Sequence, residues 1–266
     1  MTRYIRYILV GIGVIQLIFA VGFFMQVTAI TRLWPLPYTN ALSFIFIASI
    51  TAAAAASTLW CVIMREDAGL AGVALDYVAI FIPLAILMFQ LAGGRSNSAL
   101  TTFGLVCIAQ VVVGLALLAW SLRRPVRDRR PVPRLVRVSF GVFVVALIIA
   151  GGQMVLKNTH IMPWQISTDA TIVYGWMFLG AAAYFAYGLL RPGWYNAGGQ
   201  LAGFLAYDLV LIIPFLQRLP TVGPELRTNL IIYVSVLVYS GLLAIYYLFL
   251  HPGTRFRRPS RTGAAT

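Results

Sequence analysis

Two aspartates lie inside long apolar stretches of this chain. Asp76 is followed by Tyr77 and Asp208 is preceded by Tyr207, so each stretch carries an adjacent acid and phenol. A carboxylate in the hydrocarbon core of a bilayer costs about 2.5–3.5 kcal/mol on insertion scales, and such residues commonly mark ion, proton or substrate sites. These four residues are therefore our candidates for substrate or ion binding.

A proline follows each of these pairs in the same stretch, Pro83 in the first and Pro214 in the second. Aligning the two prolines places the aspartate of one stretch opposite the tyrosine of the other, one residue or about 100° of helix out of register. A proline also deprives the carbonyl four residues earlier of its donor, here at Ala79 and Val210. Two carboxylates, two phenols and two such carbonyls can hold a cation or relay a proton.

The alternative interpretation of the aspartates is packing. A buried Asp can bond a Tyr, Ser or Trp of a neighbouring helix and so fix the bundle. Such bonds average only about 0.6 kcal/mol in membrane proteins. The two interpretations differ in whether the carboxylates share one site or have separate partners.

The composition is that of an integral membrane protein. Of the 266 residues, 61% are hydrophobic and only 10% are charged, whereas soluble domains have about 25% charged residues. The net charge of +13 does not indicate a nucleic-acid partner, because the basic residues lie between the apolar runs. We therefore expect membrane lipids, and no nucleic acid, around this chain.

Eight apolar runs are each about long enough to cross a bilayer core as a helix. The expected fold is all-α, a polytopic membrane protein with eight transmembrane helices. The runs are 7–25, 42–64, 68–91, 99–122, 138–156, 170–190, 201–216 and 230–250. The shortest, 201–216, is expected to extend back through Ala197, Gly198 and Gly199.

Similar residues recur in the same order in the two halves of the chain. The matches are Trp34-Pro35 with Pro163-Trp164, Gly72 with Gly203, Pro83 with Pro214, Gly114 with Gly241, and Pro125 with Pro252. Each half holds four runs, an even number, so both halves enter the membrane in the same direction. This predicts two tandem four-helix repeats related by a pseudo-two-fold axis along the membrane normal.

The predicted organisation has four parts. Residues 1–122 form the first transmembrane repeat and 138–250 the second. Residues 123–137 form a basic linker, and 251–266 a basic tail. The linker holds seven arginines and several prolines, a composition that keeps a segment in water or at headgroups and attracts anionic lipid. The alternative contact for the linker is a membrane-protein partner.

The basic residues predict the orientation. With the N-terminus inside, 15 of the 20 basic residues fall on the cytoplasmic side, as the positive-inside rule requires. Both termini are then cytoplasmic. All basic residues but Lys157 are arginine, which is typical of G+C-rich bacterial coding and indicates a bacterial plasma membrane.

The outer loops of the two halves carry matching polar residues. Arg32 and His160 occupy equivalent outer positions and are candidates for contact with an anionic headgroup or solute. Thr39 and Ser167 follow the loop prolines and are expected to cap the next helices. Interfacial anchoring by Trp34 is the plainer explanation of the first loop.

Residues for metal or redox chemistry are scarce. The two histidines fall on opposite sides of the membrane, and Cys61 and Cys107 show no Cys-x-x-Cys spacing. No metal site, cofactor or catalytic residue is therefore predicted. The scarcity argues against an enzyme without settling the question.

Three functions fit these observations. The first is a small-solute or ion transporter or channel with its site between the repeats. The others are an accessory or assembly subunit of a membrane complex, and a membrane-embedded enzyme that modifies lipids. A water-accessible cavity that reaches both aspartates would favour the first.

Overall fold

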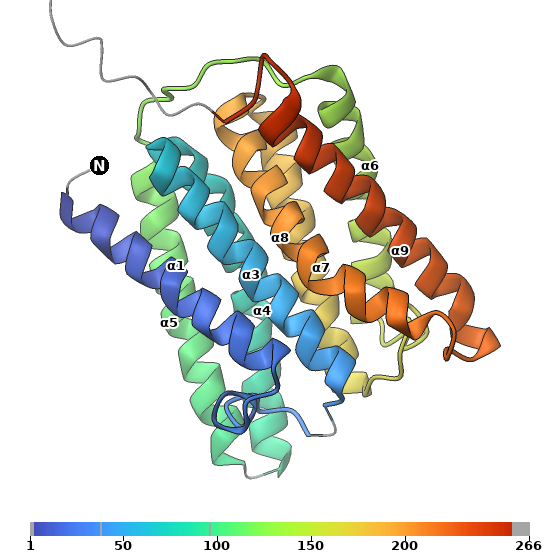
Figure 1. The fold of residues 1–266 in the computed structure, drawn as a ribbon. Coiled ribbons are helices and arrows are strands. Elements are labelled where there is room, and N and C mark those ends of the chain that lie inside the picture. Colours follow the sequence, from blue (N-terminus) through green and yellow to red (C-terminus); the bar gives the residue numbers. More distant parts are fainter. Residues whose placement is uncertain (1–2, 38, 96, 257–266) are drawn as a thin grey trace, which may run out of the picture.

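The fold, taken from a computed structural model, is all-helical over the residues that the structure describes, which are 3–37, 39–95 and 97–256. Residues 257–266 of the predicted tail lie outside them. Figure 1 shows the helices in chain order: α1 (Arg3–Phe24), α2 (Thr28–Thr31), α3 (Ala41–Met64), α4 (Leu70–Arg95), α5 (Ser98–Ser121), α6 (Arg134–Val155), α7 (Thr168–Leu190), α8 (Trp194–Arg218) and α9 (Pro224–Ile245). A 3-10 turn, η1 (Asp67–Gly69), precedes α4, and a π-helical turn, η2 (Tyr246–Leu250), continues α9.

Eight of these helices are long and apolar enough to span a membrane, which confirms the prediction of a multi-pass membrane protein. A helix is the form in which a segment satisfies its own backbone without water. In α3 and α7, a side chain caps the free N–H groups of the first turn. Asn40 accepts from the amide of Ser43 at 2.9 Å, and Ser167 accepts from the amide of Ala170 at 3.3 Å.

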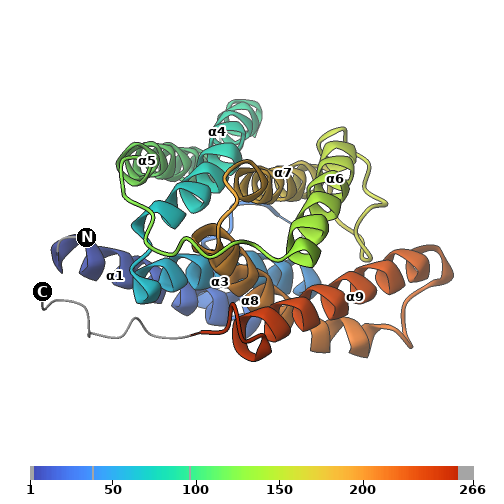
Figure 2. The same cartoon turned by 90° about the horizontal axis from the view of Figure 1, so that it is seen from above.

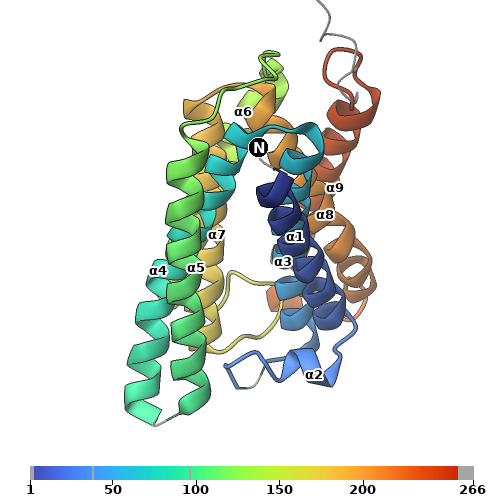
Figure 3. The ribbon, with the colours of Figure 1, turned by 90° about the vertical axis from the view of Figure 1, so that its left-hand side faces the viewer.

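The eight long helices form two layers of four (Figures 2 and 3). One layer has the order α5, α4, α7, α6, and the other the order α1, α3, α8, α9. Each layer holds a pair of helices from each half of the chain, and the two halves meet where α4 packs on α7 and α3 packs on α8. We call the end that carries residues 122–133 the linker end, and the opposite end, with residues 25–40 and 156–167, the loop end.

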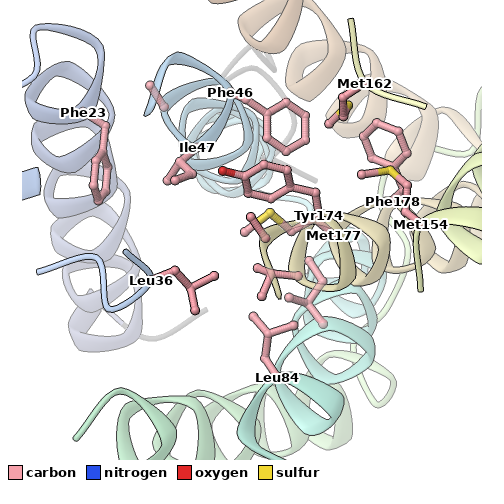
Figure 4. Close-up of a cluster of buried hydrophobic side chains, with 14 of the residues drawn as sticks. Phe23, Leu36, Phe46, Ile47, Leu84, Met154, Met162, Tyr174, Met177 and Phe178 are labelled. Atoms are coloured by element: carbon pink, nitrogen blue, oxygen red, sulfur yellow. The ribbon is translucent and has the colours of Figure 1, made fainter. Parts of the chain in front are cut away.

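Two clusters of buried hydrophobic side chains fill the ends of the bundle. At the loop end Phe46 of α3 is fully buried, with its ring 4.8 Å from that of Tyr174 and 5.8 Å from that of Phe178, both in α7 (Figure 4). At the linker end a second cluster gathers around Trp60 and Trp194.

Helix α8 begins at Trp194, well before the apolar run at 201–216. Its first turns carry small and polar residues that lie close to α3. A methyl group added to Gly198 would be 2.7 Å from the indole of Trp60. Close packing on α3 is therefore the reason that this part of α8 has few bulky apolar residues.

Glycine also sets the approach of α6 to α7. A methyl group on Gly151 would lie 2.9 Å from the carbonyl oxygen of Gly175, closer than real Cβ atoms come to backbone. The next residue, Gly152, has open space where its Cβ would be. Small residues at one helix face permit such backbone contact.

These two adjacent glycines give a matched test of the packing. Gly151→Ala should lower the free energy of unfolding by about 1–3 kcal/mol, because the two helices must move apart. Gly152→Ala should leave it unchanged or raise it slightly, since alanine favours the helix. Unfolding in mixed detergent measures both. Equal effects of the two substitutions would contradict the close α6–α7 approach.

Candidate functional site

A cavity of about 800 Å³ lies between the two clusters. Its walls come from α3, α4, α6, α7, α8 and α9. Along α3, its lining residues Ile50 to Ser57 fall between Ile47 of the loop-end cluster and Trp60 of the linker-end cluster. Both Asp76 and Asp208 line it. The cavity has the volume of an ordinary small-molecule site.

Asp208 lies in the middle of α8 and is 4% exposed. Neither of its carboxylate oxygens has a hydrogen-bond partner among the described residues. The nearby hydroxyl of Ser240 in α9 donates to its own helix, at the carbonyl of Val236, over 2.7 Å. Because burying a charge without a partner is very costly, this carboxylate must be neutralised by a proton or a bound cation.

Asp76 lies on α4 and faces α7. Its Oδ1 is buried and has no partner in the described part of the chain. The side chain occupies the space left by Gly180, where a methyl group would come within 2.6 Å of Oδ1. Asp76 and Asp208 thus reach one cavity from different layers of the bundle.

Tyr207 also lines the cavity, next to Asp208. Its hydroxyl is hydrogen-bonded to that of Tyr233 in α9, which lines the cavity too. Its ring packs edge-on against Phe46, with the centroids 6.3 Å apart. Tyr207 is therefore held in place from both neighbours of α8 in its layer, α3 and α9.

Tyr77, the fourth predicted site residue, is not part of the cavity lining. Its hydroxyl accepts a hydrogen bond from Nε2 of Gln16 in α1. Tyr77 therefore contacts α1, whereas Asp76, about 100° away around the helix, faces α7 and the cavity. The structure therefore brings together three of the four predicted residues.

Several polar cavity residues were missed by sequence reasoning, and three of them lie where α3, α7 and α8 meet. Gln200 of α8 donates to the backbone carbonyl of Tyr184 in α7 at 2.6 Å, and Ser57 of α3 donates to the carbonyl of Gly199 at 3.0 Å. Tyr184 lines the same wall. Their one sequence signal is a polar residue within an apolar helix, which hydrogen bonding between helices also explains.

The predicted outer residues lie apart from the cavity. The side chains of Arg32 and His160 are exposed at the loop end. The backbone carbonyl of His160 accepts a hydrogen bond from Asn229 of α9. Nothing in this geometry links either side chain to the two aspartates.

The basic linker is fixed to the bundle by a buried acid. Glu66, between α3 and η1, is 3% exposed and accepts hydrogen bonds from the amides of Arg127 at 3.1 Å and Asp128 at 2.5 Å. Burial raises the pKa of Glu66, and the two amide donors offset this only in part. The carbonyl of Arg130 in turn accepts from the amide of Trp194, at the start of α8. The linker therefore contacts both halves of the chain.

The linker arginines divide into two groups. Arg130 forms an ion pair with Asp128, with 2.6 Å between Nη2 and Oδ2, and Arg124 stacks over Trp120 at 4.4 Å. The others are exposed, at positions 123, 127, 129, 134 and 137. These exposed cations are available to groups outside the chain.

Within the described ranges, no three His, Cys, Asp or Glu side chains gather closely enough to hold a metal ion. Comparison with known proteins gives no match: no family model fits the chain, and no curated protein or solved structure is significantly similar to it. The function has to be argued from the cavity.

The Glu66 anchor predicts a pH dependence of stability. Since its pKa is raised on folding, the folded protein holds this proton more tightly than the unfolded chain. The contribution of Glu66 to stability is complete at pH values below its ordinary pKa of 4.5. It is lost as the pH rises through the higher pKa of Glu66 in the folded protein. Between about pH 4 and pH 7, the wild type should therefore lose stability relative to Glu66→Gln.

Unfolding in detergent at several pH values measures this difference. Glu225→Gln is the matched control, because Glu225 is an exposed acid at the far end of the bundle. A difference between wild type and Glu66→Gln that stays constant with pH, or that changes in the opposite direction, would contradict the assignment.

Proposed function

We propose that this integral membrane protein is a carrier or channel for a small cationic solute or for protons, with Asp76, Tyr207 and Asp208 at its site. The observation that supports this most is the Asp208 carboxylate. It is buried, lines a cavity of about 800 Å³ and has no hydrogen-bond partner among the described residues. An acid in such a place is poised to bind and release a positive charge.

The packing interpretation fits this geometry less well. An acid kept only to fix helices together would be bonded to a neighbouring side chain, as Gln16 is to Tyr77. Removing the partner of a buried polar group costs about 1–3 kcal/mol. That cost is present at Asp208 without any offsetting bond from the described residues.

We also propose that the two halves are tandem repeats, which would place the site at their interface. The helix pairs support this, because α1 packs on α3 as α6 packs on α7, and α3 meets α8 as α7 meets α4. The helix ends agree as well. Gln26 after α1 and Lys157 after α6 both have left-handed backbone, with φ of 52° and 70°.

This correspondence would explain why Tyr77 is bonded in the first half while its counterpart in the second half, Asp208, has no hydrogen-bond partner among the described residues. Counting back ten residues from Gln26 and Lys157 makes Leu147 the counterpart of Gln16, just as Asp208 is the counterpart of Tyr77. The first half has a bonded amide and phenol at these places. The second half has an aliphatic side chain and a carboxylate, both at the cavity.

For the orientation we propose a bacterial plasma membrane with both termini in the cytoplasm, supported by the concentration of arginine at the linker end. The exposed linker arginines would then contact anionic headgroups of the inner leaflet. An impermeant thiol reagent applied to intact cells should label a single cysteine placed at Thr221, but not one placed at Arg129. The reverse pattern would contradict this orientation.

The site itself predicts a loss of pH-dependent flux. Replacing Asp76 and Asp208 together by Asn keeps the side-chain volume but removes the titrating groups. Proton or cation flux into liposomes should fall by at least about tenfold and lose its pH dependence, since no carboxylate remains to bind the charge. A pH-sensitive dye inside the vesicles measures it.

Asp169→Asn serves as the control, because this aspartate lies in the first turn of α7 near the aqueous end. It should leave the flux unchanged. Equal flux in the wild type and the double Asn variant, with both proteins folded, would refute the proposed function.

A further inference from the structure

The cavity reaches the surface of the protein on one side. Part of its lining consists of side chains that are exposed at the surface, on α6 and on α9. Val138 and Val142 of α6 are 64% and 60% exposed, and Ile232 of α9 is 59% exposed. Figure 2 places α6 and α9 together at one end of the two layers. In a membrane-spanning bundle this surface faces lipid.

A hydrogen bond made by α9 bounds this opening at each end. Towards the linker end, the hydroxyls of Ser139 in α6 and Tyr239 in α9 are hydrogen-bonded at 2.6 Å. Towards the loop end, Asn229 of α9 donates to the backbone carbonyl of Ile161 at 3.5 Å. We call the opening between these two bridges the lateral window.

Along α4, packed side chains close the cavity towards both aqueous ends. Along α4, the lining residues Val73 to Ile80 lie between Leu70 of the linker-end cluster and Leu84 of the loop-end cluster. Both of those leucines are buried to 1% exposure or less. The exposed side chains of the lining are therefore those at the lateral window, and this is the side from which a ligand would enter.

The lining combines an apolar surface with negative charge. Most of its side chains are aliphatic or aromatic, and its acids are Asp76 and Asp208. Among the described residues that line it there is no Lys, Arg or His. A ligand that matches both properties has an apolar body and one positive charge.

We propose that the cavity takes an amphipathic organic cation directly from the bilayer through the lateral window, with the charge held at Asp208 and Asp76. This inference rests on the proposed function and names its substrate class. The apolar body replaces lipid contacts with the walls of the cavity. The charge meets the Asp208 carboxylate and Oδ1 of Asp76, which otherwise have no hydrogen-bond partner among the described residues.

A hydrophilic ion fits the site less well than such a cation. It would lose its hydration shell on entering a mostly apolar cavity, and the carboxylates replace only part of that shell. An anion or an uncharged lipid would leave the buried acids without a counter-charge. Both classes serve as negative probes.

Three probes separate charge from hydrophobicity. Tetraphenylphosphonium is a lipophilic cation, tetraphenylborate has nearly the same shape with a negative charge, and tetramethylammonium is a small hydrophilic cation. Equilibrium binding to the protein in lipid nanodiscs, corrected for empty nanodiscs, should detect tetraphenylphosphonium alone. Asp208→Asn should weaken its binding by at least about tenfold. Specific binding of tetraphenylborate with similar affinity would overturn the proposal.

The route is tested at the window. Val142→Trp places a bulky ring where the cavity reaches lipid, whereas Val145→Trp adds the same ring to α6 at a position that is 58% exposed but outside the lining. The first should slow tetraphenylphosphonium association several-fold, and the second should not. Equal association rates in the two variants would overturn access through the window.

The outcomes separate this inference from the proposed function. If proton or tetramethylammonium flux depends on the aspartates while tetraphenylphosphonium does not bind, the substrate class is wrong and the carrier stands. If tetraphenylphosphonium binds in an Asp208-dependent way without any flux, the site is correct and the carrier is not. If neither binding nor flux depends on the aspartates, both proposals fail.

Discussion

The lack of water in the bilayer core governs this structure. Every polar group there must find a partner within the protein, which is why the described chain consists of long helices joined by short connections. The same constraint accounts for Gln16 bonded to Tyr77 and for Gln200 bonded to a backbone carbonyl. Against this background the Asp208 carboxylate stands out, because it is buried and has no partner among the described residues.

The arrangement in two layers makes room for that exception. Helices of different halves meet as α3 with α8 and as α4 with α7, and glycines allow several of these approaches. Gly180 leaves the space for Asp76, and Gly203 lies against Ser57 of α3. The backbones of α3 and α8 lie close together, as do those of α4 and α7. The cavity lies between the two layers, and it opens where α6 and α9 make few contacts with each other.

The helices were predictable from the sequence because apolar runs of about 20 residues have few alternatives in a bilayer. Other features depend on contacts between distant residues. The expected extension of the 201–216 run back through Ala197, Gly198 and Gly199 is confirmed, and α8 begins three residues earlier still, at Trp194. The first cap was one residue off, since the hydroxyl of Thr39 donates to Leu36 and Asn40 caps α3 instead. The sequence of α4 alone does not reveal which of its sides faces the cavity, because that depends on the neighbouring helices. The position of Tyr77 outside the cavity lining could therefore not be predicted.

The ties between the halves have a mechanical consequence. At the linker end, residues 127–130 connect Glu66 with Trp194, and at the loop end Asn40 donates to the carbonyl of Gln165 at 2.7 Å. Separation of the halves as rigid bodies would break contacts at both ends together. Helix α9 is tied to α6 by the Ser139–Tyr239 hydrogen bond at the linker end, and to the loop after α6 by Asn229, which donates to the carbonyls of His160 and Ile161. The bundle is thus stiff across its centre and compliant along one edge, so that local spreading of this edge costs less than any rotation of one half against the other.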